Sequence, residues 1–161
     1  MSETNRILVE AGDYWLGDPC YSFNGPREDE WIKWLEAADY TNNQKVLHAK
    51  VPNTEFSVLG FGTAYGDGYY AGSDGNNYAV DAGLIGLVPV GYTNDEIPTY
   101  QDGSKRPICT RVSFKEDTEC WIEYTENLRS PDSWARLTKW VLHFGAITID
   151  TIGEDEDDES F

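Results

Sequence analysis

The residues best suited to nucleophilic chemistry are one cysteine and two histidines. Cys20 follows Asp18-Pro19, where proline fixes the backbone of a turn. A thiol becomes a catalytic nucleophile when a base lies beside it, and the chain's only imidazoles belong to His48 and His143. With Asp81 as the third member, Cys20 and either histidine would form a triad for hydrolysis or group transfer. Because no basic residue adjoins the turn, we favour a structural role for Cys20, as a small buried residue.

Three aspartates in a glycine-rich stretch could supply oxygen ligands to a metal ion such as calcium. These are Asp67, Asp74 and Asp81, and their spacing does not follow the twelve-residue EF-hand loop. We therefore interpret Asp67 and Asp74 as turn residues and Asp81 as a hydrogen-bonding residue. The three cysteines lack the paired spacing of a zinc site, and no phosphate-binding glycine loop is present. The sequence predicts neither a metal nor a cofactor.

The same stretch is rich in tyrosine. Residues 60–91 hold nine of the 15 glycines, and glycine permits tight turns and close backbone approach. Tyrosines beside acidic residues on such turns are typical of contact surfaces, although alternate tyrosines in a strand could instead face the core. Both interpretations stay open. The predicted contact residues are Asp18, Tyr21, Tyr65, Asp67, Tyr69, Tyr70, Asp74, Tyr78 and Asp81.

The composition limits which partners the protein can bind and indicates its cellular compartment. The 161 residues carry a net charge of −17, and six of the acids form the run Glu154–Glu159. Phosphate contacts need basic patches, so we expect no direct binding to nucleic acid or to an anionic membrane. The chain shows no membrane-length apolar run and no secretory signal, and its odd cysteine count gives no disulfide framework. These features predict a cytoplasmic protein with reduced thiols, in the host cell if a phage encodes it.

The elements that position these residues are mostly strands. Pro26–Tyr40 has acids in its first turn and one apolar face, which predicts a helix. Hairpins are predicted for 46–51 with 56–61, for 69–70 with 78–80, and for 108–114 with 119–125. Leu84–Val90 is a nearly continuous apolar run and predicts a central strand. The remaining predictions are strands at 7–10 and 14–16, a short helix over 130–137, and strands at 140–144 and 146–152 joined at Gly145.

These elements predict one mainly β domain over residues 1–152. Its architecture would be an antiparallel sheet, a partly open barrel or a sandwich, with the amphipathic helix packed on it. Residues 153–161 form an acidic segment that we expect to be disordered, because a run of like charges cannot bury itself.

Four segments together carry a family resemblance. They are Gly17–Tyr21 (GDPCY), Phe61–Gly68 (FGTAYGDG), Val80–Gly86 (VDAGLIG) and Ile147–Thr151 (ITIDT). The chain resembles a group of small uncharacterised bacteriophage and bacterial proteins, and is distantly similar to a bacterial domain of unknown function. The resemblance spans about residues 7 to 152. It implies a single mostly β domain and a phage origin, and it points to Asp18, Asp67 and Asp81 without supplying an activity.

The sequence therefore favours a non-enzymatic binding or inhibitory protein. Such a phage accessory or anti-defence factor would occupy a host protein or sequester a small ligand through the glycine, tyrosine and aspartate region. Three alternatives remain: an acidic mimic of nucleic acid, a Cys20-dependent hydrolase or transferase, and a structural or assembly component. A homo-oligomer is compatible with each.

Overall fold

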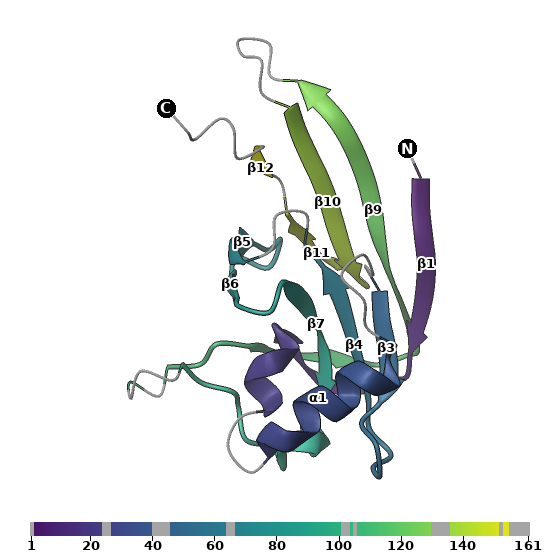
Figure 1. The fold of residues 1–161 in the computed structure, drawn as a ribbon, viewed down its shortest axis with the longest axis vertical. Coiled ribbons are helices and arrows are strands. Elements are labelled where there is room, and N and C mark those ends of the chain that lie inside the picture. The colour runs from purple at the N-terminus through teal and green to yellow at the C-terminus, as the bar shows by residue number, and fades with distance from the viewer. Residues whose placement is uncertain are drawn as a thin grey trace.

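The computed structural model describes most of the chain, from residue 2 to residue 154 (Figure 1). The described ranges are 2–23, 27–39, 46–63, 67–100, 104, 106–129, 136–151 and 153–154, with backbone alone for 2–5, 125–129, 136–139 and 153–154. As predicted, the fold is mainly β, with antiparallel sheets that do not close into a barrel.

One sheet, here called the long sheet, has the strand order β1-β9-β10-β11. Its strands are β1 (Ser2–Val9), β9 (Thr118–Arg129), β10 (Arg136–Phe144) and β11 (Ile147–Asp150), and the short β12 (Gly153–Glu154) also pairs with β10. Gly145 joins β10 to β11 with a positive φ of 64°, a conformation that favours glycine. The predicted closing strands joined at Gly145 are therefore confirmed.

The second sheet, here called the helix-covered sheet, has the order β3-β4-β7-β2-β8. Its strands are β2 (Gly12–Gly17), β3 (Val46–Lys50), β4 (Ser57–Gly62), β7 (Leu84–Pro89) and β8 (Thr110–Phe114). The apolar strand β7 is central, as its composition predicts. The hairpin of β3 with β4 is confirmed, and β5 (Gly68–Ala71) pairs with β6 (Asn77–Val80) in a separate two-stranded sheet.

The main core lies between the two sheets and extends under the β5–β6 hairpin. Alternate residues of each strand point into it, because side chains in a strand have a period of two. Leu16, Leu59 and Ile85 come from the helix-covered sheet, and Ile122 and Leu142 come from the long sheet; each is at most 1% exposed.

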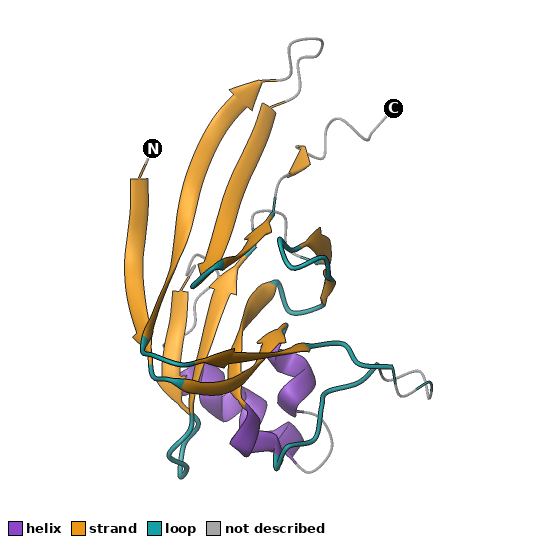
Figure 2. Ribbon diagram, turned by 180° about the vertical axis from the view of Figure 1, so that it is seen from behind, coloured by secondary structure: helices purple, strands orange, loops and turns teal. Residues whose placement is uncertain are grey.

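Helices lie against the other face of the helix-covered sheet (Figure 2), and a second core is buried there. The helix α1 (Glu28–Ala37) buries Trp34 completely there, and the Trp34 indole N–H donates to the carbonyl of Ala49 at 3.1 Å. The 3-10 turns η1 (Pro19–Phe23) and η3 (Val90–Thr93) add Phe23 and Tyr92. The predicted helix thus exists, while Pro26 and Tyr40 lie outside the described residues.

The predicted hairpin of 108–114 with 119–125 is wrong. β8 pairs with β2, whereas β9 pairs with β1 and β10, so the turn between them crosses from one sheet to the other. The chain makes the same crossing from β1 to β2. The two crossings are adjacent. The amide of Ala11, between β1 and β2, donates a hydrogen bond to Asp117, between β8 and β9, at 3.0 Å. β8 and β9 both alternate because they face the same core from opposite sheets, which the pattern cannot distinguish from a hairpin.

The prediction of a short helix over 130–137 is wrong for residues 136 and 137, which belong to a strand. β10 begins at Arg136, and Leu137 pairs with Leu128 across the long sheet, so strand pairing overrides the local helical pattern. Residues 130–135 lie outside the described residues. The first two residues of the predicted acidic segment pair with β10 as β12, and 155–161 also lie outside the described part.

Candidate functional site

Asp18 is a fully buried carboxylate that ties two distant segments together. It stands between the end of β2 at Gly17 and the start of η1 at Pro19, and it is 0% exposed. Its Oδ2 accepts the backbone N–H groups of Asp81 and Ala82, each at 2.7 Å, and its Oδ1 accepts that of Cys20 at 3.0 Å. Asp18 therefore fastens the Gly17–Tyr21 turn to the Val80–Gly86 segment.

Burial and hydrogen bonding act on Asp18 in opposite directions. Desolvation raises the pKa of its carboxyl, while the three amide donors and the Cys20 thiol lower it, and burial has the larger effect. No solvent reaches this carboxyl. Its contribution is to satisfy backbone donors, so Asp18 cannot itself contact a partner.

Tyr21 and Asp81 meet at the edge of the same cluster. The Tyr21 hydroxyl donates a hydrogen bond to Oδ2 of Asp81, which is exposed, whereas Tyr21 is half-buried. Burial, followed by this bond to a carboxylate, raises the pKa of Tyr21. Of the predicted contact residues, Asp18, Tyr21 and Asp81 thus come together, but only the outer part of this cluster reaches solvent.

Cys20 lies in this cluster without a base. Burial and the carboxylates of Asp18 and Asp81 raise the pKa of its thiol. His143 instead pairs with Glu123 at 2.9 Å, on the outer face of the long sheet, and its ring stacks on Trp121. His48 lies on β3, in a groove that Cys20 does not line. The structure therefore does not bring the predicted triad together.

The low reactivity expected of these buried thiols can be measured, and the measurement tests the hydrolase alternative. Cys20 is half-buried and Cys109 and Cys120 are buried, and burial raises the pKa of Cys120 to about 12. We expect the folded protein to react with iodoacetamide at pH 8 at least about tenfold more slowly than the same chain in urea, since only thiolates react. Mass spectrometry of quenched samples measures the rate. An activated nucleophile would give the opposite result, with Cys20 reacting faster in the folded protein.

The β5–β6 hairpin separates its tyrosines between core and solvent. Tyr70 is 8% exposed and Tyr78 is 1% exposed, whereas Tyr69 is 75% exposed, more than the other exposed large apolar or aromatic side chains that the structure describes. Asp67, one residue before β5, is also exposed, and Tyr65 lies outside the described residues. Tyr70 and Tyr78 therefore face the core, as one interpretation has it, while Tyr69 faces solvent and stays a predicted contact residue.

Hydrogen bonds fix this hairpin to the body. Asp74 accepts from the Tyr78 hydroxyl at 2.6 Å and from the backbone and side chain of Asn76 at 3.1 and 3.0 Å. The Ser73 amide donates to the Thr148 carbonyl at 2.8 Å, and the Thr148 amide donates to the Ser73 hydroxyl at 3.0 Å. Desolvation raises the pKa of Asp74, but its hydrogen bonds from Tyr78 and Asn76 together have the larger effect, so the pKa is lowered. Asp74 is therefore a turn residue, as predicted, and Tyr69 is displayed from a braced hairpin.

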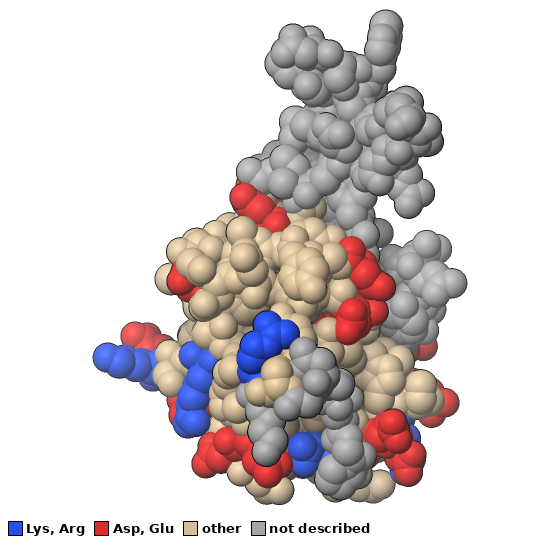
Figure 3. Space-filling view, turned by 90° about the vertical axis from the view of Figure 1, so that its left-hand side faces the viewer, with Lys and Arg blue, Asp and Glu red and all other residues tan. Residues whose placement is uncertain are grey.

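The face around β5 and β6 has an uncharged area bordered by acidic side chains. Figure 3 shows this face, with lysine and arginine side chains interspersed among acids below the uncharged area. A nucleic-acid mimic needs a continuous acidic surface, and the described part of this face does not present one. An uncharged centre with a charged rim is instead the usual arrangement of a protein–protein interface.

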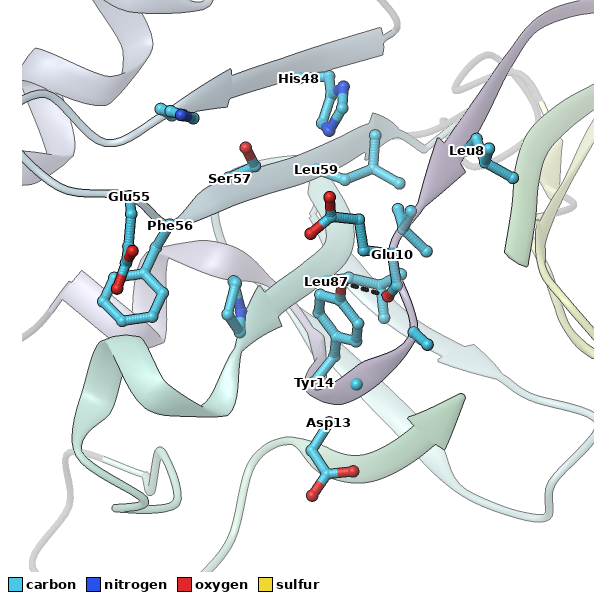
Figure 4. A pocket seen from close by; sticks show the side chains of 15 residues that line it. Leu8, Glu10, Asp13, Tyr14, His48, Glu55, Phe56, Ser57, Leu59 and Leu87 are labelled. Carbon is cyan, nitrogen blue, oxygen red and sulfur yellow. Dashed lines mark hydrogen bonds between the residues drawn. The ribbon is translucent and has the colours of Figure 1, made fainter. Parts of the chain in front are cut away.

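A groove opens where the two sheets diverge, between the β1–β2 crossing and the edge strand β3. Its volume is about 590 Å³, and Figure 4 shows Glu10 between Leu59 and Leu87, with His48 on the other side of Leu59. Burial lowers the pKa of His48. His48 was predicted as a base, whereas Glu10 was not predicted as a site residue, because it follows a strand at a crossing that no motif marks.

The described residues hold neither a metal cluster nor a membrane-spanning helix. Within them, no three histidine, cysteine, aspartate or glutamate side chains are grouped so that they could hold a metal ion. No helix among them is long and apolar enough to cross a membrane.

Fold and site together define a mainly β protein that carries a braced, tyrosine-bearing hairpin. Comparisons with protein-family models, with curated proteins and with solved structures find no match.

Proposed function

We propose that this chain is a non-enzymatic binding protein that acts by occupying a partner protein. The contact surface, here called the hairpin surface, comprises Asp67, Tyr69 and the uncharged area around β5 and β6. The observation that carries the proposal is the 75% exposure of Tyr69 on a hairpin that hydrogen bonds fix to β11.

Exposure and rigidity together favour binding. A tyrosine offers a large contact area at a low entropic cost, and tyrosines are frequent among the residues that dominate binding energy. A surface that is already ordered loses less conformational entropy when it binds. The bonds of Asp74 and Ser73 supply that order for the residues around Tyr69.

Charge indicates the chemistry of the partner. The hairpin surface is bordered by acidic side chains at its sides and by lysine and arginine among acids below, and the whole chain carries a net charge of −17. A partner with basic residues around an apolar or aromatic-accepting pocket would be attracted over long range and would pair with the rim. Following the phage resemblance, we propose a cytoplasmic host protein as that partner, with inhibition by occupation as the effect.

Replacing Tyr69 by Ala should remove the anchor of the hairpin surface. We expect capture of the partner from bacterial lysate to fall at least about tenfold, because hot-spot tyrosines contribute roughly 2 kcal/mol or more to binding. Stability should change by less than about 0.5 kcal/mol, since the side chain is exposed. Quantitative mass spectrometry of the captured proteins, with a urea titration of each variant, measures both.

Ile32→Ala provides the matched control. Ile32 is 56% exposed on α1, away from β5 and β6, so its replacement removes an exposed apolar side chain elsewhere. Equal capture by wild type, Tyr69→Ala and Ile32→Ala would show that the hairpin surface binds nothing. Failure of wild type to capture any protein would count against a protein partner.

A further inference from the structure

The groove beside the β1–β2 crossing is a second concave site, separate from the hairpin surface. Tyr14, Leu59 and Leu87 are buried and form its apolar floor. The titratable side chains that line it, apart from Tyr14, come from three segments, and they are Glu10, Asp13, His48, Lys50 and Glu55. Its volume of about 590 Å³ lies within the range of small-molecule sites.

The topology explains why the groove is open. β1 is an edge of the long sheet and β3 is an edge of the helix-covered sheet, and the chain crosses from one sheet to the other at Glu10 and Ala11. The two edges do not pair with one another, so a groove is left between them, in which Leu8 is exposed and Phe56 and Pro89 are half-buried. The Tyr14 hydroxyl donates to the Glu10 carbonyl at 2.7 Å and fixes the backbone of the crossing.

The groove contains more carboxylates than cations. Asp13 is already paired with Arg111 at 2.6 Å, and burial lowers the pKa of His48, which disfavours its charged form. Of the groups lining the groove, Lys50 is then the one cation, against the carboxylates of Glu10 and Glu55. Neither of those carboxylates forms an ion pair within the described residues.

The two carboxylates lie at different places along the groove, each beside apolar side chains. Figure 4 shows Glu55 next to Phe56 toward one end, and Glu10 next to Leu59 and Leu87 further along. Two anionic groups separated along an apolar lining match a ligand that has two cationic ends joined by an apolar stem. The net charge of −17 would also concentrate such a polycation near the protein.

We propose that the groove binds a free linear aliphatic polyamine, with its ammonium groups at Glu10 and Glu55 and its methylene chain over the apolar floor. Charged hydrogen bonds at each end give orientation, and burial of methylenes gives affinity. The polyamine is bound without covalent change. This site goes beyond the proposed function and does not require the hairpin surface.

Isothermal titration calorimetry with spermidine and with 1,5-diaminopentane tests the proposal. We expect wild type to bind both, and Glu10→Gln and Glu55→Gln each to weaken binding about tenfold, since each removes one charged contact. Pentan-1-ol, which has the stem without the charges, should not bind measurably. Neither substitution disturbs the bond of the Tyr14 hydroxyl, which goes to the Glu10 backbone carbonyl.

Glu36→Gln separates the groove from general attraction to an acidic protein. Glu36 is exposed on α1 and carries the same charge as the groove residues. We expect Glu36→Gln and Tyr69→Ala to bind spermidine as wild type does. Equal weakening by Glu36→Gln, equal binding of pentan-1-ol, or no heat of binding at millimolar spermidine would each overturn the proposal, whatever the result for the hairpin surface.

Discussion

Replacing Asp18 by Asn should destabilise the protein by about 3 kcal/mol. The substitution keeps the shape of the side chain, but it exchanges one accepting oxygen for an NH₂ donor. Three backbone N–H groups converge on this carboxylate, those of Cys20, Asp81 and Ala82. In either orientation, the new amide places a donor against at least one of these donors, and a buried donor without an acceptor costs about 1–3 kcal/mol.

Chemical unfolding in urea, followed by tryptophan fluorescence, measures this loss. The control is Asp67→Asn, which makes the same chemical change at an exposed position and should alter the free energy of unfolding by less than about 0.5 kcal/mol. Similar stabilities for Asp18→Asn and wild type would show that Asp18 does not hold the two segments together.

Replacing Gly86 by Ala should have a comparable or larger effect. Gly86 of β7 pairs with Gly60 of the neighbouring antiparallel strand β4, and a Cβ at Gly86 would lie 1.7 Å from the carbonyl oxygen of Leu59. That oxygen belongs to the backbone, so relief requires the central strands to move apart. We expect a loss of more than about 3 kcal/mol, or failure to fold, because overpacking against a fixed backbone is among the costliest core changes.

Gly60→Ala is the matched control for this position. A Cβ at Gly60 would meet the ring of Trp34 at 3.4 Å, which is an ordinary van der Waals distance. We expect that variant to lose less than about 1 kcal/mol. Soluble yield and urea midpoints of the two variants measure the difference, and equal losses would show that the strands adjust to a methyl group at either position.

Local pairing could be predicted from the sequence, while pairing between distant strands could not. The hairpins β3–β4, β5–β6 and β10–β11 join neighbouring segments, so their turn residues and alternation identify both partners. The failure at β8 and β9 has a physical cause. Alternation reports which face of a strand is buried, and two strands in opposing sheets around one core show the same pattern as a hairpin.

The candidate site shows the same difference between local features, which the sequence predicts, and contacts between distant segments, which it does not. Asp18 and Asp81 were each singled out in separate motifs, but the bond between Asp18 and the Asp81 amide spans 63 residues and leaves no local signal. Tyr69 was predicted as a contact residue together with Tyr70 and Tyr78, and the alternation of β5 and β6 decides which of them faces solvent. Glu10 and Glu55 were missed because a crossing and a turn between strands bring them to one groove, and neither belongs to a motif.

Hydroxyl-radical footprinting of Tyr69 tests the central claim most directly. The side chain should be oxidised readily in the free protein, because it is 75% exposed, and its oxidation should fall at least about tenfold in the complex isolated from bacterial lysate. Ile32 should be modified equally in both states. Protection of another surface, with Tyr69 oxidised as fast in the complex as in the free protein, would contradict the assignment of the hairpin surface as the binding site.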